Sequence, residues 1–123
     1  MSESERNLLR WNLESIWSIA WIASLSDELT VTGGISDQLA GFFPKLPTQE
    51  PAEPFFAKVS VRGMDELYEK LDLFYRAHWY ARDCRVNAVA DTSFNEGVML
   101  FRRTPLEWVL HDDVGWDDVD IST

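Results

Sequence analysis

Apolar residues recur at helical spacing near the start of the chain. The recurring positions are Leu9, Leu13, Ile16 and Ala20. Ser2 and Glu5, just before them, have the spacing of a capping box, which predicts that a helix begins there. Trp11 and Ile22 lie toward another side of the same predicted helix. We therefore expect this helix to be central and covered on more than one face.

A second helical pattern occupies residues 64–84. Its apolar stripe consists of Leu67, Leu71, Phe74 and His78, and it is widened by Met64, Tyr68 and Tyr75. Two further helix starts follow, one at Ser93 with Glu96 three residues later and one at Thr104 with Pro105 at the first helical position. We expect Pro105 to restart or kink a helix, not to lie inside an unbroken one.

The segment between these patterns is rich in proline. Residues 44–54 hold four prolines, which predicts an extended connector, and residues 36–43 suggest one short helix before it. The two phenylalanines at 55–56 are expected to anchor the connector on the core. No stretch alternates convincingly with a period of two. The pattern predicts an all-α fold: a compact single domain over residues 1–123, with four to five helices and a docked acidic C-terminal segment.

The charge balance narrows the possible partners. The 123 residues include 11 basic and 21 acidic ones, which gives a net charge of −10. Nucleic acid and anionic membranes are therefore unfavourable partners. A basic protein partner suits this charge, and plain solubility suits it equally well. The most apolar stretch, residues 16–25, is shorter than the roughly 20 residues that span a bilayer. The single cysteine, Cys84, and the lack of a signal-peptide pattern predict a cytoplasmic protein.

No motif for a metal or a cofactor is visible. The two histidines and one cysteine do not have the recurring spacing of zinc ligands, and the aspartates near the end do not form a calcium-binding loop. His78 and Cys84 are six residues apart, so on one helix they face different directions. The sequence therefore predicts no metal site and no cofactor.

Two polar residues on apolar helix faces are candidates for chemistry. His78 is either a general base or a structural hydrogen-bond donor, for example to Glu14. Glu14 needs a partner if it is buried, and the basic candidates are Arg76, Arg82, Arg102 and Arg103. Together with Trp116, the residues Glu14, His78, Arg82 and Arg102 form either a structural network or an alternative pocket between helices.

The chain ends in an unusually acidic segment. Its aspartates are Asp112, Asp113, Asp117, Asp118 and Asp120. Gly115 favours a turn after a helix end, and Trp116 looks like an anchor between the carboxylates. The segment is either docked structure, pinned by Trp116, Val119 and Ile121, or the surface that binds a basic partner.

Several motifs resemble the bacterial domain of unknown function 4272 family. They are RWNLESIWSIAWIASL, VRGMDELYEKLDLFYRAHWYARD and FRRTPLEWVLHDDVGWDDVDIST, which together cover most of the chain. The matching positions are Trp11, Glu14, Ser15, Trp21, Tyr75, Arg76, His78, Trp79, Arg102, Arg103, Leu106, Trp108, Trp116, Asp117, Val119 and Thr123. Pro105, Ser122 and a shorter N-terminus depart from the family pattern. The resemblance implies the helical fold, with Trp116 and Asp117 as structural constants of the tail. It implies no reaction.

Three functions remain open at this stage. The first hypothesis is a small acidic binding protein of the immunity or antitoxin type, which occludes the active site of a basic toxin. The second is an enzyme of unrecognised type with a Glu/His/Arg pocket between helices. The third is a structural or oligomerising module.

Overall fold

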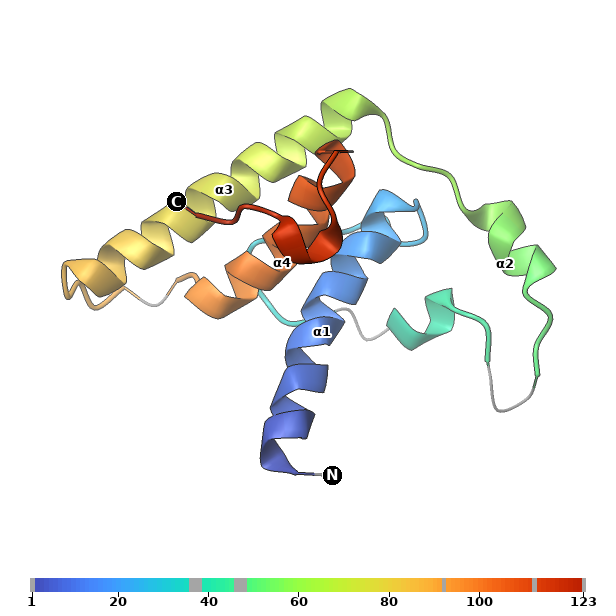
Figure 1. The fold of residues 1–123 in the computed structure, drawn as a ribbon, viewed down its shortest axis with the longest axis horizontal. Helices are drawn as coiled ribbons and strands as arrows, with labels where there is room; N and C mark the ends of the chain where they lie inside the picture. Colours follow the sequence, from blue (N-terminus) through green and yellow to red (C-terminus); the bar gives the residue numbers. More distant parts are fainter. Residues whose placement is uncertain (1, 36–38, 46–48, 92, 112, 123) are drawn as a thin grey trace.

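The computed structural model describes residues 2–35, 39–45, 49–91, 93–111 and 113–122. Its elements in chain order are α1 (Glu3–Ile22), η1 (Leu39–Phe42), α2 (Glu53–Lys58), α3 (Met64–Val86), α4 (Glu96–Leu110) and η3 (Trp116–Asp118). The elements labelled η are short 3₁₀ turns. None of the described residues forms a strand, and the long helices pack on one another, so the all-α prediction is confirmed (Figure 1).

The central helix is α4, because α1 and α3 both pack mainly on it (Figure 1). The expectation that the first helix is central is therefore wrong. Trp17 and Ala20 of α1, Phe74 of α3, and Met99 and Leu106 of α4 meet in the core. Periodicity identified apolar helices, but the choice of the central one depends on how the helices are arranged.

The outer faces of α1 and α3 carry more apolar surface than the sequence indicated. Leu9 and Leu13 belong to the apolar pattern that predicts α1, yet both are exposed. Tyr68 and Tyr75 of α3 are exposed as well. Both helices bury one face against α4 and leave other apolar residues on the surface.

Helix α1 begins as the sequence predicts and ends at a long loop. Ser2 and Glu5 form the expected capping box. At the other end, no basic residue lies in the last turn of α1. Arg62 takes the place of a basic residue in that turn. Its Nε donates to Trp21 O at 2.5 Å, and its Nη2 donates to Ser26 O at 2.7 Å. A residue distant in sequence thus holds the carbonyls at this helix end.

Helix α4 runs unbroken through Pro105, so the expected restart or kink at this residue is wrong. Proline has no N–H, and the carbonyl of Phe101, four residues earlier, loses its helical donor. Ser15 of α1 replaces that donor, because its Oγ donates to Phe101 O at 2.8 Å. Thr104 is not a cap, since its hydroxyl donates to Leu100 O at 2.7 Å. The helix tolerates proline because a neighbouring helix completes its hydrogen bonding.

Helix α4 also starts slightly later in the sequence than predicted. The helix begins at Glu96, and its cap is Asn95, whose side chain accepts from Val98 N at 3.0 Å. Ser93, the expected cap, bonds to Asp91 instead. An asparagine closer to the apolar run was the better cap.

The proline-rich connector contains more helix than expected. Its last residues enter α2, with Pro54 near the helix start, where a proline is tolerated. Phe55 packs against Phe43 at 5.8 Å between ring centroids, whereas Phe56 is exposed. Only the first of the two phenylalanines thus packs toward the core.

Candidate functional site

Two consecutive arginines occupy the middle of α4. Arg102 and Arg103 have relative exposures of 0% and 2%, although arginine is rarely fully buried. Successive residues on a helix point about 100° apart, so the two guanidinium groups enter different environments. Arg102 faces α1 and Arg103 faces α3.

Arg102 sits in a closed polar network. Its Nε donates to Glu14 Oε2 at 2.7 Å, and its two terminal nitrogens donate to Thr30 O at 2.7 Å and Gly33 O at 2.9 Å. The guanidinium carbon also lies 4.7 Å from the ring centroid of Trp17. Every nitrogen of the group has an oxygen acceptor. Arg102 therefore fixes the loop after α1 against the bundle, and its full burial keeps it from any ligand.

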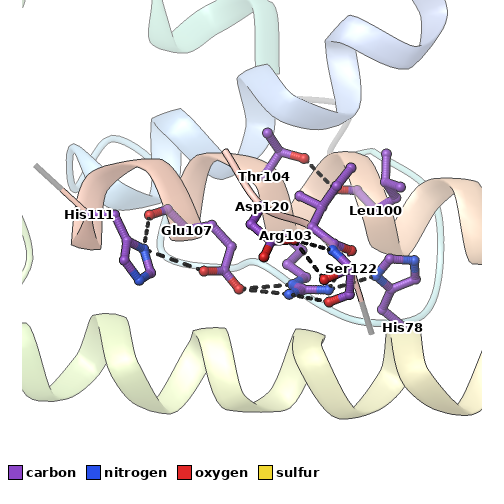
Figure 2. A network of polar contacts seen from close by, with 9 residues as sticks. His78, Leu100, Arg103, Thr104, Glu107, His111, Asp120 and Ser122 are labelled. Atoms are coloured by element: carbon purple, nitrogen blue, oxygen red, sulfur yellow. Dashed lines mark hydrogen bonds and ion pairs between the residues drawn. The ribbon is translucent and has the colours of Figure 1, made fainter. Parts of the chain in front are cut away.

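Arg103 connects α4 to α3 and to the C-terminal segment. Its Nε and Nη2 both approach Glu107 Oε1, at 3.0 and 2.9 Å. Its Nη1 donates to Ile121 O at 3.0 Å, and its Nη2 donates to Ser122 O at 3.2 Å. Figure 2 shows the guanidinium between Glu107 on one side and His78 on the other. The last described residues of the chain are thus held by a buried cation.

The neutral form of His78 completes this network. Its Nδ1 lies 3.0 Å from Arg103 Nη1, and a guanidinium can only donate, so Nδ1 accepts and the proton resides on Nε2 (Figure 2). Burial lowers the pKa of His78 below its ordinary value of 6.5, and the charge of Arg103 lowers it further. Because Arg103 occupies the Nδ1 lone pair, this nitrogen is not available as a general base.

A cavity of about 340 Å³ lies beside Arg103, under the C-terminal segment. Its lining residues are Tyr75, Arg103, Glu107, His111, Val114, Asp118, Val119, Asp120 and Ser122. An open groove of about 520 Å³, lined by Tyr75, Arg76, Trp79 and Tyr80, shares Tyr75 with it. Polar groups from α4 and the C-terminal segment therefore meet aromatic side chains of α3 at this place.

The C-terminal segment is docked and also presents its carboxylates to solvent. Trp116 contacts Trp108 edge to face at 5.5 Å between ring centroids, and both rings remain about 40% exposed. Asp113, Asp117, Asp118 and Asp120 are all exposed. Asp120 accepts from Ser122 N and Oγ, and these bonds lower the pKa of Asp120. Asp112 lies outside the described residues, as does Thr123.

The predicted network residues divide into two groups. Glu14 pairs with Arg102, one of its four candidate partners, whereas His78 pairs with Arg103 on another side of α4. Glu14 and His78 therefore have different partners. Arg82 is exposed on α3, and Trp116 belongs to the C-terminal segment.

Glu107 and His111 both line the cavity, although the sequence indicates no site at either; the spacing predicted Glu107 only as the third residue of a helix that starts at Thr104. A signal for Glu107 was present, since it follows Arg103 by four residues on the same helix face. His111 follows Glu107 by four residues again. No local sequence pattern predicts that the C-terminal segment packs over these two residues.

The described residues contain neither a candidate metal site nor a candidate membrane span. No group of three His, Cys, Asp or Glu side chains there is placed to hold a metal ion. No helix there is both long enough and apolar enough to cross a membrane.

Comparison with known proteins assigns the family. The family model described as Domain of unknown function (DUF4272) matches residues 1–119, so the chain belongs to this family. No curated protein and no solved structure matches the chain. Function therefore has to be inferred from the site.

Proposed function

We propose that this chain is a cytoplasmic binding protein of the immunity or antitoxin type, which neutralises a basic toxin by covering its active site. One observation carries the proposal. Asp113, Asp117 and Asp118 are exposed and make no ion pair within the described part of the chain. In the sequence they lie on both sides of Trp116, which forms an exposed pair with Trp108. We call these five residues the acidic–aromatic surface.

Each component of this surface suits a protein partner. Tryptophan is enriched among the residues that dominate binding energy, because it buries a large area at small conformational cost. Carboxylates beside it attract a basic surface and speed association. A toxin that acts on an anionic substrate has such a basic surface at its active site.

The anchoring by Arg103 supports the proposal further. Arg103 fixes the backbone of Ile121 and Ser122, and Trp116 rests on Trp108 of α4. A segment held in this way loses less conformational entropy on binding than a free tail does. The acidic–aromatic surface is therefore preorganised for a partner.

The experiment is a pull-down with tagged protein, compared among three forms. The Asp113→Asn/Asp117→Asn/Asp118→Asn variant removes three charges from the surface. A matched control, Glu3→Gln/Glu53→Gln/Asp65→Asn, removes three exposed charges elsewhere. The wild type and the control should capture one basic protein that high salt releases, and the surface variant should lose it. The captured protein should be a toxin, and about one equivalent of this chain should abolish its activity, as expected for a tight complex.

Two results would refute the whole proposal, and a third would refute its immunity part. Capture of no basic protein by the wild type would remove the partner altogether. Equal loss of capture in the surface variant and in the control would show that only net charge matters. A captured protein without an activity that this chain inhibits would leave a binding protein but not an immunity protein.

A further inference from the structure

One face of α3 carries an exposed apolar stripe along most of its length. Tyr75 lies at the centre, and the other positions are 4, 7 and 11 residues away on both sides. On an α-helix, these offsets bring side chains to within about 40° of one direction. Five of the side chains are large, apolar and at least 42% exposed, namely Met64, Tyr68, Tyr75, Trp79 and Val86. The two remaining positions are Leu71, which is half-buried, and Arg82, which is exposed. We call these seven residues the α3 stripe.

Helix α3 lies at one edge of the structure, and among the described helices only α4 packs extensively on it (Figure 1). The surface along the stripe is hollowed toward either end of the helix. The groove lined by Tyr75, Arg76, Trp79 and Tyr80 has a volume of about 520 Å³. A second groove of about 240 Å³ is lined by Tyr68, Leu71, Asp72, Tyr75 and Glu107. Two helices pack by inserting side chains of one into such hollows of the other, so this face suits a further helix.

The α3 stripe matches itself when the helix is reversed. Because its positions are symmetric about Tyr75, Met64 corresponds to Val86, Tyr68 to Arg82, and Leu71 to Trp79. A two-fold axis at Tyr75 therefore places each stripe residue opposite a stripe residue of a second, antiparallel copy, over about 33 Å of helix. Self-complementarity of this kind is what the interface of a two-fold symmetric dimer requires.

The charges of α3 select a second copy over another kind of protein. Residues 64–74 contain four acidic residues and one lysine, whereas residues 76–86 contain three arginines and one aspartate. A basic partner would suit the first half and be repelled by the second, and an acidic partner would meet the opposite difficulty. An antiparallel second copy matches both halves at once.

The most specific contact of this pairing joins Tyr68 to Arg82 of the second copy. Asp65 and Asp72 lie three residues before and four residues after Tyr68, so both are its neighbours on the helix surface. Both carboxylates are exposed. An arginine over Tyr68 thus stacks on an aromatic ring between two carboxylates, which suits a planar guanidinium. The two-fold axis forms this contact twice.

We propose that two copies of this chain associate through the α3 stripe as an antiparallel dimer, with the two-fold axis at Tyr75. Each copy carries a net charge of −10, which opposes self-association at long range. Burial of the aromatic rings and the two arginine contacts offset this repulsion. The inference goes beyond the proposed function and does not depend on it, because the α3 stripe contains none of the residues of the acidic–aromatic surface.

Analytical ultracentrifugation of the full chain in about 0.15 M salt, which screens surface charges beyond about 8 Å, measures the association. The wild type should sediment at twice the mass of one chain. Trp79→Ala should raise the dissociation constant of the dimer by about 30-fold or more, as the loss of a dominant aromatic residue does. The control Phe56→Ala removes an exposed ring of α2, outside the stripe, and should leave the dimer unchanged. A monomeric wild type at about 100 µM, or equal weakening in the control, would overturn the inference.

A charge exchange tests the arginine contact. Arg82→Glu places a carboxylate between Asp65 and Asp72 of the second copy, so it should weaken the dimer by about tenfold or more. Adding Asp65→Arg to this variant restores opposite charges and should recover a tighter dimer. A loss caused by a change within one copy would not be repaired in this way. Absence of recovery would therefore refute the pairing of Arg82 with the surroundings of Tyr68.

Cysteine crosslinking tests the register. Tyr75→Cys should form a disulfide between two copies under mild oxidation, because residue 75 meets itself at the axis. Leu71→Cys and Trp79→Cys should crosslink when the two variants are mixed. Neither should crosslink alone, since each lies about 12 Å along the helix from its own copy. The native Cys84 is buried and points to the opposite side of α3 from Tyr75. Crosslinking of each variant with itself as readily as in the mixture would refute the antiparallel arrangement.

Discussion

Arg102 and Arg103 are neighbours in sequence and both are buried, yet their surroundings differ in one decisive respect. Arg102 lies in a closed site where Glu14 and two backbone carbonyls take all its nitrogens. Arg103 makes more polar contacts than Arg102, yet it lines a cavity that opens beside it. Each arginine holds one non-helical segment, the loop at 30–33 or the C-terminal residues 121–122.

The comparison shows how one residue type can be enclosed at one position and border a cavity at the next. A buried guanidinium whose acceptors are all internal can only stabilise the fold. Arg103 also holds the carboxylate of Glu107 at the wall of the cavity under the C-terminal segment. The difference arises from what covers each face of α4: the loop after α1 seals the first, and the C-terminal segment covers the second incompletely.

The largest expected effect is that of Arg102→Met. Methionine keeps much of the stem but leaves Glu14 buried without its cation, and removal of one partner of a buried pair costs about 3–5 kcal/mol. The free energy of unfolding from urea denaturation should fall by this amount. A loss below about 1 kcal/mol would mean that water reaches Glu14 and that the Arg102 site is not closed.

The matched change, Arg103→Met, should destabilise less. Water in the cavity can solvate Glu107, so we expect a loss of about 1.5–3 kcal/mol, typical of hydrogen bonds to charged groups. The variant should also free the C-terminal segment, seen as faster amide exchange and proteolysis near Ile121, while the loop at 30–33 stays protected. A loss equal to that of Arg102→Met would contradict the distinction between the two sites.

Ser15→Ala tests the hydrogen bond by which α1 compensates for Pro105 in α4. It leaves the carbonyl of Phe101 without a donor, and the stability should fall by about 1–2 kcal/mol. In a Pro105→Ala background, the restored N–H of residue 105 supplies that donor, so the same change should cost less. A double-mutant cycle of unfolding free energies measures this difference. Strict additivity would show that Ser15 does not compensate for the proline.

The smallest expected effect is a pH dependence of the folding stability, which arises from His78 beside Arg103. The folded pKa of His78 is lowered, first by burial and then by Arg103, whereas Glu96 acts in the opposite direction. Because the unfolded chain binds the proton more readily, the contribution of His78 is complete above its ordinary pKa of 6.5 and is lost as the pH falls below that value.

Urea denaturation at several pH values from neutral to acidic measures how the free energy of unfolding changes with pH. His78→Asn keeps an acceptor for Arg103 without a titrating group, and its stability should depend less on pH over the same range. A slope identical to that of the wild type would assign the pH dependence to other groups.

The elements that depend on local patterns were largely predictable. The capping box at Ser2 and the buried positions Leu67, Phe74 and His78 of α3 all appear as expected. Capping and helical periodicity act over three or four residues, so they can be identified in the sequence without knowledge of the fold. The motifs also led to the right family.

The predictions that were wrong concern residues whose environment depends on segments far away in the sequence. Pro105 indicated a break, but Ser15, far away in the sequence, supplies the missing hydrogen bond. Leu9 and Leu13 had the pattern of buried residues, but no described helix covers them. Hydrophobic spacing gives the apolar faces of a helix, and tertiary packing decides which of them are buried.

The sequence by itself determined the helical class of this protein, the acidic character of its C-terminus and the need of Glu14 for a cationic partner. Only the tertiary structure decided that α4 is central, that Arg102 and not Arg103 meets Glu14, and that a cavity lies under the C-terminal segment. The physical reason is that charge and periodicity are properties of residues and their near neighbours. The partner of a buried charge and the space beside it depend instead on which segments the fold brings together.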